Sequence, residues 1–155
     1  MLRPLQQSEG HEQVTSRSLQ NSALSLAWII ALVSTLGALF IGEVMGQTPC
    51  VLCWYQRIAM FPLALILGIA AYLEDTTIYR YVLPISIVGG LIAFWHSVLF
   101  IGIVPEIIQP CELSGPSCAG AKQTVFGIVP LPFLSFAAFV AITFLLLHPY
   151  LKRLS

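Results

Sequence analysis

The amino-acid sequence predicts an all-α membrane protein, a bundle of four transmembrane helices with two extracytoplasmic cysteine-bearing loops. Hydrophobic residues make up 57% of the 155-residue chain and charged residues only 9%, whereas soluble domains carry about 25% charged residues. The mean hydropathy is +0.87. Four stretches are long and apolar enough to cross a bilayer, which takes about 20 residues. Because so few strands cannot close a barrel in lipid, we expect each stretch to be a helix.

The chain begins with a polar segment, residues 1–21, whose mixed composition predicts a flexible cytoplasmic tail with no fold of its own. The remainder, residues 22–155, is expected to form a single transmembrane domain. Its expected spans are residues 23–42, 54–73, 81–104 and 125–147. The first and last spans contain no charged residue, and the second contains only Arg57 at its start.

The basic residues predict the orientation, because they gather on the cytoplasmic side of membrane proteins. With four spans, both termini and the middle connection share one side. That side holds most of the seven Lys and Arg residues, namely Arg3, Arg17, Arg80, Lys152 and Arg153. We therefore expect both termini in the cytoplasm and both cysteine-bearing connections outside it, where disulfides form and persist. The net charge is zero, and nothing in the composition indicates a nucleic-acid partner.

Two cysteines separated by two residues, Cys50 and Cys53, stand at the expected start of the second helix, in "TPCVLCWYQR". Unpaired backbone N–H groups and the positive end of the helix dipole stabilise a thiolate at such a position. Arg57 follows Cys53 by four residues, so the two side chains project from the same helix face. An arginine there is also typical of a side chain that reaches lipid headgroups. Beside two thiols, it favours a site for a thiolate or for an acceptor that becomes anionic.

A second cysteine pair, Cys111 and Cys118, lies in "PCELSGPSC", within a connection that spans residues 105–130. Connections longer than about 12–15 residues are usually functional or disordered, and the Ser-Gly-Pro centre of this one is turn chemistry. A small exposed disulfide loop of this kind is either a reducible pair that takes part in exchange or a structural staple. All four cysteines fall on the expected outer side of the membrane.

One more ionisable side chain, His96 in "AFWHSVLF", lies toward the outer end of the third expected span. An ionisable group inside a membrane is a candidate functional residue. It is equally consistent with a histidine that forms a hydrogen bond between helices.

These residues carry a family resemblance. The stretch "EVMGQTPCVLCWYQRIAMFPLALILGIA" resembles the first loop and second helix of the DsbB/BdbC family of disulfide bond formation proteins. The similarity covers roughly residues 24–148 and includes four spans, a second outward cysteine pair and a proline-rich start of the last helix, "VPLPFLSF". The Cys-x-x-Cys motif precedes the second pair, whereas it comes later in the vitamin K epoxide reductase-like proteins.

The resemblance implies a quinone-dependent protein thiol–disulfide oxidoreductase of the bacterial cytoplasmic (inner) membrane, which supports disulfide formation in exported proteins. Its implied partner is a thioredoxin-like periplasmic oxidase of the DsbA type. By matching positions, Cys111 would hold the mixed disulfide with that partner, and Cys118 would exchange with the Cys50–Cys53 pair through Cys50. Cys53 would pass two electrons to a membrane quinone, either ubiquinone or menaquinone.

The same resemblance implies that Arg57 holds the quinone oxygen and that His96 corresponds to a quinone-side histidine. Gln56 stands where some members carry an acid. Two other interpretations remain: a non-enzymatic membrane protein with two structural disulfides, and a four-cysteine zinc site. The C-x6-C spacing of the second pair departs from the usual zinc spacing, and we expect no metal.

Overall fold

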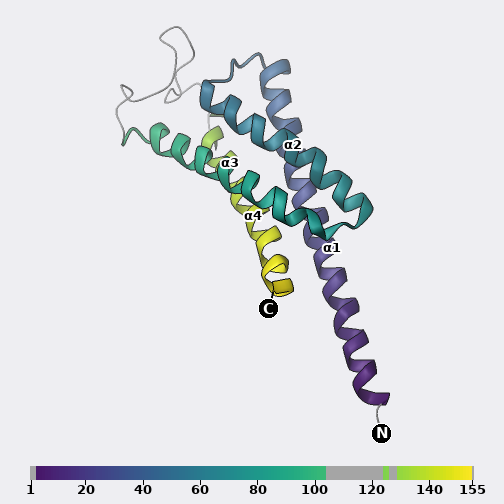
Figure 1. Cartoon of the computed structure of the whole chain (residues 1–155). Coiled ribbons are helices and arrows are strands. Elements are labelled where there is room, and N and C mark those ends of the chain that lie inside the picture. The colour runs from purple at the N-terminus through teal and green to yellow at the C-terminus, as the bar shows by residue number, and fades with distance from the viewer. Residues whose placement is uncertain (1–2, 104–123, 126–128, 155) are drawn as a thin grey trace.

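The computed structural model describes residues 3–103, 124–125 and 129–154, which form four long helices packed side by side (Figure 1). The helices are α1 (Arg3–Leu39), α2 (Val51–Leu73), α3 (Tyr79–Phe100) and α4 (Leu131–Leu154). Short elements adjoin them, namely a π-helical turn η1 (Phe40–Val44), a 3₁₀ turn η2 (Thr76–Ile78), and the strands β1 (Thr124–Val125) and β2 (Val129–Pro130). All four helices contain a segment long and apolar enough to cross a membrane. The predicted all-α, four-helix membrane fold is confirmed.

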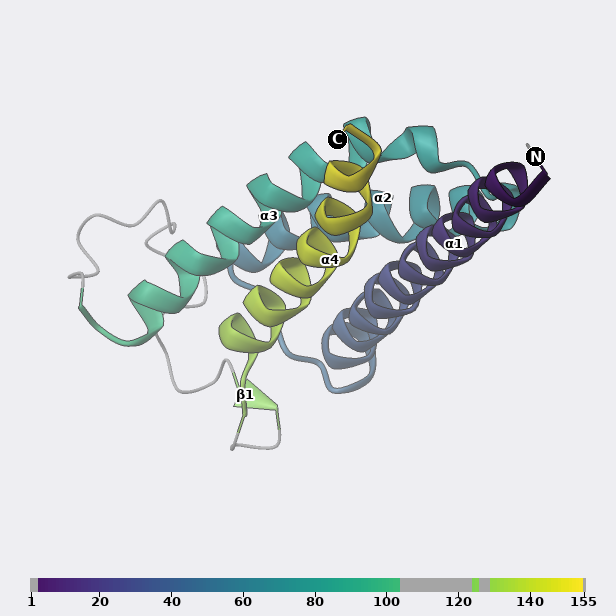
Figure 2. The ribbon, with the colours of Figure 1, turned by 90° about the horizontal axis from the view of Figure 1, so that it is seen from below.

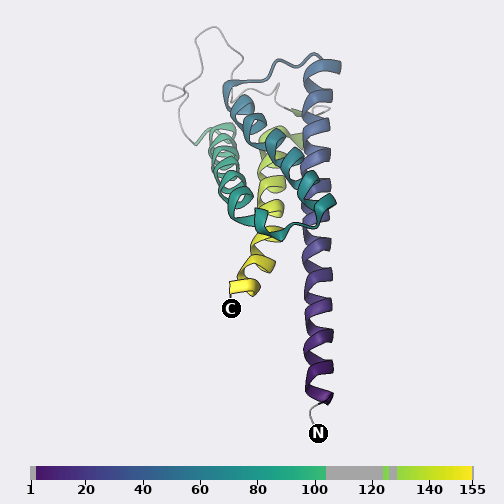
Figure 3. The ribbon, with the colours of Figure 1, turned by 45° about the vertical axis from the view of Figure 1, so that its right-hand side comes forward.

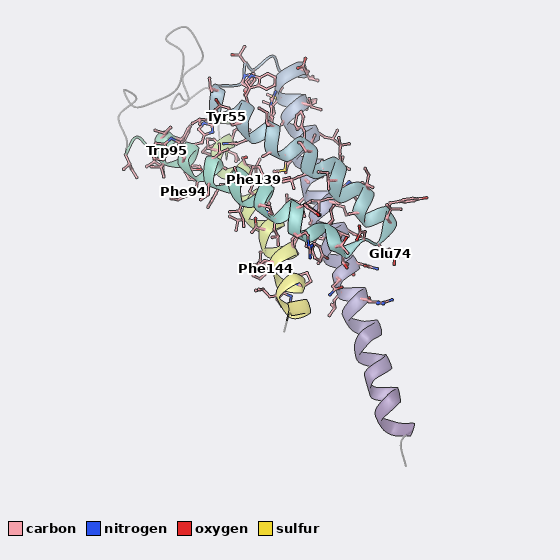
Figure 4. All side chains as sticks on the ribbon, in the orientation of Figure 1. Tyr55, Glu74, Phe94, Trp95, Phe139 and Phe144 are labelled. Atoms are coloured by element: carbon pink, nitrogen blue, oxygen red, sulfur yellow. The ribbon has the colours of Figure 1, made fainter. Side chains whose placement is uncertain are left out.

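The helices form a bundle in which each one packs mainly against two neighbours. α1 packs against α2 and α4, and α3 packs against the same two helices, as the view from below shows (Figure 2). Both termini lie at one end of the bundle, and the connection from α1 to α2 lies at the other (Figure 3). Glu74, at the turn after α2, and Tyr55, near the start of α2, lie toward these opposite ends (Figure 4).

The core follows from helical spacing of apolar residues. In α1, the buried residues Leu24, Ala27 and Ala31 recur every three or four positions and so lie on one face. Facing residues of the other helices complete the main cluster, including Leu63 and Leu67 of α2, Val82 and Ala93 of α3, and Phe139, Ile142 and Leu146 of α4. Many large apolar side chains instead remain exposed on the outer surface, where a membrane-spanning bundle meets lipid.

Small and polar residues bring α3 and α4 close together. Gly89 of α3 leaves space for the ring of Phe139 of α4, because a Cβ on Gly89 would overlap that ring. Beside it, the hydroxyl groups of Ser86 and Thr143 lie 2.8 Å apart and share a hydrogen bond. Both features are typical of helix contacts within membranes.

The element boundaries differ from the predicted ones. α2 begins at Val51 and not at residue 54, and α3 covers Tyr79–Phe100 and not 81–104; the largest differences are in α1 and α4. α1 begins at Arg3, so the polar segment 1–21, expected to lack a fold, is helical from that residue on; its cytoplasmic location stays a prediction. The fourth membrane segment begins at Leu131 and not at residue 125, because β1 and β2 pair in antiparallel fashion just before it. Pro132 disfavours an extension of α4 toward the N-terminus, because a proline disfavours helical conformation in the residue before it. In the first turn of α4 itself a proline is tolerated.

Candidate functional site

Cys50 caps the start of α2. Its backbone is extended, with φ −72° and ψ 169°, and its sulfur accepts a hydrogen bond from the Cys53 backbone N–H at 3.4 Å. A residue with this geometry turns its side chain back over the first helical turn. Cys50 is therefore fully buried, whereas Cys53, one turn later, is only half-buried.

The two sulfurs form a hydrogen-bonded thiol pair. Cys50 Sγ donates to Cys53 Sγ at 3.1 Å, and no disulfide joins them. The hydrogen bond to Cys53 and burial together raise the pKa of Cys50 to about 12 from its ordinary 9.0. The sequence predicted that the helix start would stabilise a thiolate here. At Cys50, burial and the bond to Cys53 outweigh that effect.

His96 of α3 lies against the buried side of this pair. Its Nε2 is 3.7 Å from Cys50 Sγ, and its Nδ1 is 3.0 Å from the side-chain Nε2 of Gln56. Both His96 and Gln56 are buried. Gln56 was not predicted as a site residue, although an uncharged polar side chain next to Arg57 in an apolar span was a signal for it.

Arg57 lies one turn beyond Cys53 and is held by two contacts. Its Nη2 donates to the Ala38 carbonyl of α1 at 2.7 Å, and its guanidinium lies 5.6 Å from the centre of the Trp54 ring. The absence of a side chain at Gly42 gives it room, since a Cβ there would come within 2.9 Å of Nη2. Ala38 stands just before η1, and π-helical turns of this kind are frequent at functional sites.

A pocket of about 750 Å³ lies between α1, α2 and α4, and Cys53, Gln56 and Arg57 line it. The rest of its lining is mostly apolar and includes Ile30, Met60, Phe61, Leu131 and Ala138. This volume is in the usual range for small-molecule sites. His96, expected on the quinone side, does not line the pocket but lies behind Cys50.

The connection from α1 to α2 closes one end of this region. Gln47 Nε2 donates to the Thr124 carbonyl of β1 at 3.4 Å, and Gln47, Thr48 and Pro49 also line the pocket. This contact ties the segment before Cys50 to the short strand pair that precedes α4.

The structure therefore brings together four of the six predicted site residues: Cys50, Cys53, Arg57 and His96. The other two, Cys111 and Cys118, lie outside the described residues. Cys50, Cys53 and His96 place one potential metal-ligand atom each within 4.8 Å of one another. However, two sulfurs on one tetrahedral zinc ion would stand about 3.8 Å apart, so the 3.1 Å spacing is that of a thiol pair.

Comparison with known proteins identifies the family. The family model described as "Disulfide bond formation protein DsbB" matches residues 20–148. This chain belongs to the DsbB family. A "Probable disulfide formation protein" of Metapseudomonas resinovorans is 57% identical over 124 residues, which cover 80% of this chain and 86% of that relative. No solved structure matches the chain.

Two further relatives of this DsbB family member are also named as disulfide formation proteins. "Disulfide bond formation protein C" of Bacillus subtilis (strain 168) is 44% identical, with 77% of this chain and 86% of the relative covered. A "Probable disulfide formation protein" of Coxiella burnetii (strain RSA 493 / Nine Mile phase I) is 37% identical over 88% of this chain and 93% of its own length. The DsbB family member described here is thus a multi-pass membrane oxidoreductase of disulfide bond formation.

Proposed function

We propose that this protein is a quinone-dependent thiol oxidase that reoxidises a DsbA-type partner outside the cytoplasmic membrane. The observation that carries the proposal is the position of Cys53. Its sulfur contacts that of Cys50 and also lines a pocket that contains Arg57. Electrons that arrive at the cysteine pair could therefore pass from Cys53 to an acceptor in the pocket, beside the positive charge of Arg57.

The pocket fits a quinone by its chemistry. Its mostly apolar lining suits a ring with an isoprenoid tail, and its volume of about 750 Å³ accommodates the ring and part of the tail. The Arg57 guanidinium has five N–H donors, and none of the described carboxylates pairs with it. It would hold a quinone oxygen and stabilise negative charge there. A bound quinone supplies an acceptor for two electrons and two protons.

The thiol side of the reaction needs both cysteine pairs. In the proposed relay, a partner thiolate attacks Cys111 of the outer pair and forms a mixed disulfide. The released Cys118 thiolate then attacks Cys50, and Cys53 leaves as a thiolate in the pocket. Each exchange makes one S–S bond and breaks another, so net oxidation requires the acceptor beside Cys53. This relay places both pairs on the extracytoplasmic side, in the inner membrane of a bacterium.

Replacement of Cys53 by Ser tests the electron route. Purified protein supplied with quinone and a reduced DsbA-type partner should oxidise the partner, and the Cys53→Ser variant should lose this turnover. The variant should still form the mixed disulfide between Cys111 and the partner, because that exchange breaks only the bond between Cys111 and Cys118. Full turnover by Cys53→Ser would show that electrons leave by another route. Inert, fully oxidised cysteines would instead support the structural-disulfide interpretation.

Replacement of Arg57 by Gln tests the quinone site. Loss of a charge-assisted hydrogen bond should raise the KM for quinone about tenfold, while the KM for the partner protein changes little. Arg80→Gln is a matched control, since Arg80 is exposed at the start of α3, at the other end of the bundle. An equal rise in the KM for quinone and in the KM for the partner protein would indicate that Arg57 serves folding and not quinone binding.

A further inference from the structure

We infer that Gln56 is a positioning residue that fixes the tautomer of His96, so that the His96 Nε2–H is donated to Cys50 Sγ and stabilises this sulfur when it leaves as a thiolate. The inference deepens the proposed function, since it rests on the exchange of the outer cysteine pair with Cys50. In this inference His96 forms its hydrogen bond with the Cys50 sulfur and not with the electron acceptor.

The first step is the direction of the bond between Gln56 and His96. The side-chain amide nitrogen of Gln56 faces His96 Nδ1 at 3.0 Å. An amide nitrogen only donates, so Nδ1 must accept. In a neutral imidazole one ring nitrogen carries the proton and the other is an acceptor. With Nδ1 as the acceptor, the proton stands on Nε2.

The second step is what Nε2 faces. Nε2 lies 3.7 Å from Cys50 Sγ, within range for a bond to sulfur. The same sulfur accepts the Cys53 backbone N–H at 3.4 Å. Cys50 therefore receives two N–H donors, one from its own helix and one from α3. A carboxylate at position 56 would instead accept from Nδ1, so the amide of this chain selects the donor form at Nε2.

The third step is why Cys50 needs a donor. The partner's second thiolate first displaces Cys111 from the mixed disulfide, which oxidises the partner and frees the Cys111 thiolate. In the resolving exchange, this thiolate attacks Cys118 in the disulfide between Cys118 and Cys50. A bond forms between the sulfurs of Cys111 and Cys118, the bond to Cys50 breaks, and its electron pair stays on Cys50 Sγ. This sulfur is fully buried, so water does not solvate the new charge. The proton stays on Nε2 throughout, and His96 acts as a hydrogen-bond donor.

The titration of Cys50 agrees with this geometry. Donation to Cys53 and burial raise its pKa, and the hydrogen bond from His96 acts in the opposite direction and lowers it. Among the described residues, the titratable groups that act on Cys50 are Cys53 of α2 and His96 of α3. Arg57 donates to Ala38 of α1, and Glu43 of η1 is exposed.

The tautomer can be observed directly. Full-length protein labelled with ¹⁵N-histidine contains His11, His96 and His148, and the signals of His96 are those lost in His96→Gln. We expect a protonated Nε2 and an unprotonated Nδ1 in the reduced protein. In Gln56→Met, which is similar in size but has no donor, a mixture of both tautomers should appear. A proton on Nδ1 in the unchanged protein would overturn the inference, and so would an unaltered tautomer in Gln56→Met.

The effect on the thiol is measured in a full-length chain that keeps only Cys50, with Ser at positions 53, 111 and 118. The pH dependence of the rate of alkylation by iodoacetamide separates the thiolate fraction of Cys50 from the access of the reagent to this buried sulfur. Rates are therefore compared at one pH after division by the limiting rate of each variant at high pH. His96→Leu should lower this rate about tenfold, as expected for one hydrogen bond to a charged group, and Gln56→Met about threefold. His96→Gln, which keeps a side-chain N–H donor, should restore most of it.

Ser97→Ala is the matched control. Ser97 is buried beside His96, but its hydroxyl bonds to the Ala93 carbonyl of its own helix, so alkylation should not change. Equal rates in His96→Leu and His96→Gln would overturn the inference. No quinone or partner protein enters either measurement, so both remain decisive even if the acceptor of the proposed function proves to be another molecule.

Discussion

At the scale of single residues, two cysteines of one short motif have different surroundings. Cys50, as the helix cap, is buried against His96, while Cys53 faces the pocket together with Arg57. The difference arises from helix geometry. A cap residue turns its side chain over the first turn, and a residue four positions before Arg57 shares the face of that arginine. In the proposed relay the two thiols would serve different steps, Cys50 the exchange with the outer pair and Cys53 the transfer of electrons.

The raised pKa of Cys50 predicts how the stability of the reduced protein depends on pH. The unfolded chain ionises Cys50 near 9.0, and the folded chain near 12. The contribution of the buried thiol is thus complete below about pH 9 and is lost as the pH rises from there toward 12. Thermal unfolding in detergent between pH 8 and about 11 should show a steeper loss for the reduced protein than for Cys50→Ala. Parallel curves for the two proteins would contradict this prediction.

Also at the scale of single residues, the sequence predicted which site residues lie close together but did not predict the contacts between them. The spacing from Cys50 to Arg57 was sufficient to place three of them at one helix start. His96, forty-six positions from Cys50, was recognised as an ionisable group in a span and, by the family resemblance, as a quinone-side histidine. Its contact with the thiol, and that of Gln56 with its ring, depend on how α3 rotates against α2. Local spacing carries no information on that rotation.

At the scale of elements, the contact between α3 and α4 shows how the bundle is held. Gly89 admits the Phe139 ring, and the Ser86–Thr143 hydrogen bond crosses the interface nearby. Phe139 lies in the middle of this contact (Figure 4) and is fully buried. Since α3 carries His96, the fit of this interface also positions the histidine against Cys50.

Substitution of Gly89 by Ala should therefore destabilise the protein. The new methyl group overlaps the Phe139 ring, and overpacking of a core costs about 1–3 kcal/mol. Gly90→Ala is the matched control, because a Cβ there would lie 3.5 Å from Phe139 Cβ, which is an ordinary contact. Thermal unfolding in detergent should rank Gly89→Ala well below Gly90→Ala. Partial recovery in the double variant Gly89→Ala, Phe139→Leu would attribute the loss to this contact.

Hydropathy predicted the membrane helices better than it predicted where each element begins and ends. The existence and approximate position of all four membrane helices followed from hydropathy, because a buried apolar run of that length has no other stable form in lipid. The start of α4 did not, since the apolar residues 125–130 suit a short strand pair as well as a helix. The π-helical turn η1 also gave no signal in the sequence, because it depends on how α1 meets the residues around Arg57.

At the scale of the whole molecule, the ends of the bundle are chemically distinct. The residues just before Cys50, at positions 47–49, line the pocket, and His96 lies against Cys50, so the thiol pair and the mouth of the pocket belong to the end with the connection from α1 to α2. Both termini lie at the other end of the bundle (Figure 1). Most of the basic residues belong to the terminal side. Basic residues predict the cytoplasmic face, so thiol chemistry and the cytoplasm are expected at opposite faces of the membrane.

Thiol labelling in intact cells tests this orientation. In a chain otherwise free of cysteine, a cysteine at position 18, which is exposed on α1, should react with a membrane-impermeant maleimide only after the cells are opened. Cys118, kept as the sole cysteine in a second chain, should react in intact cells. The reverse pattern would place the thiol chemistry in the cytoplasm and would exclude the proposed partner.

The pocket reaches the outer surface of the bundle. Its lining includes Val33, Phe40 and Leu134, each about half exposed or more. In the proposed function that surface faces acyl chains, so a quinone would reach the pocket by partitioning out of hydrocarbon, and its supply would scale with membrane area. Micelles would dilute the quinone, and turnover after extraction should follow the amount of co-purified lipid more closely than the amount of enzyme.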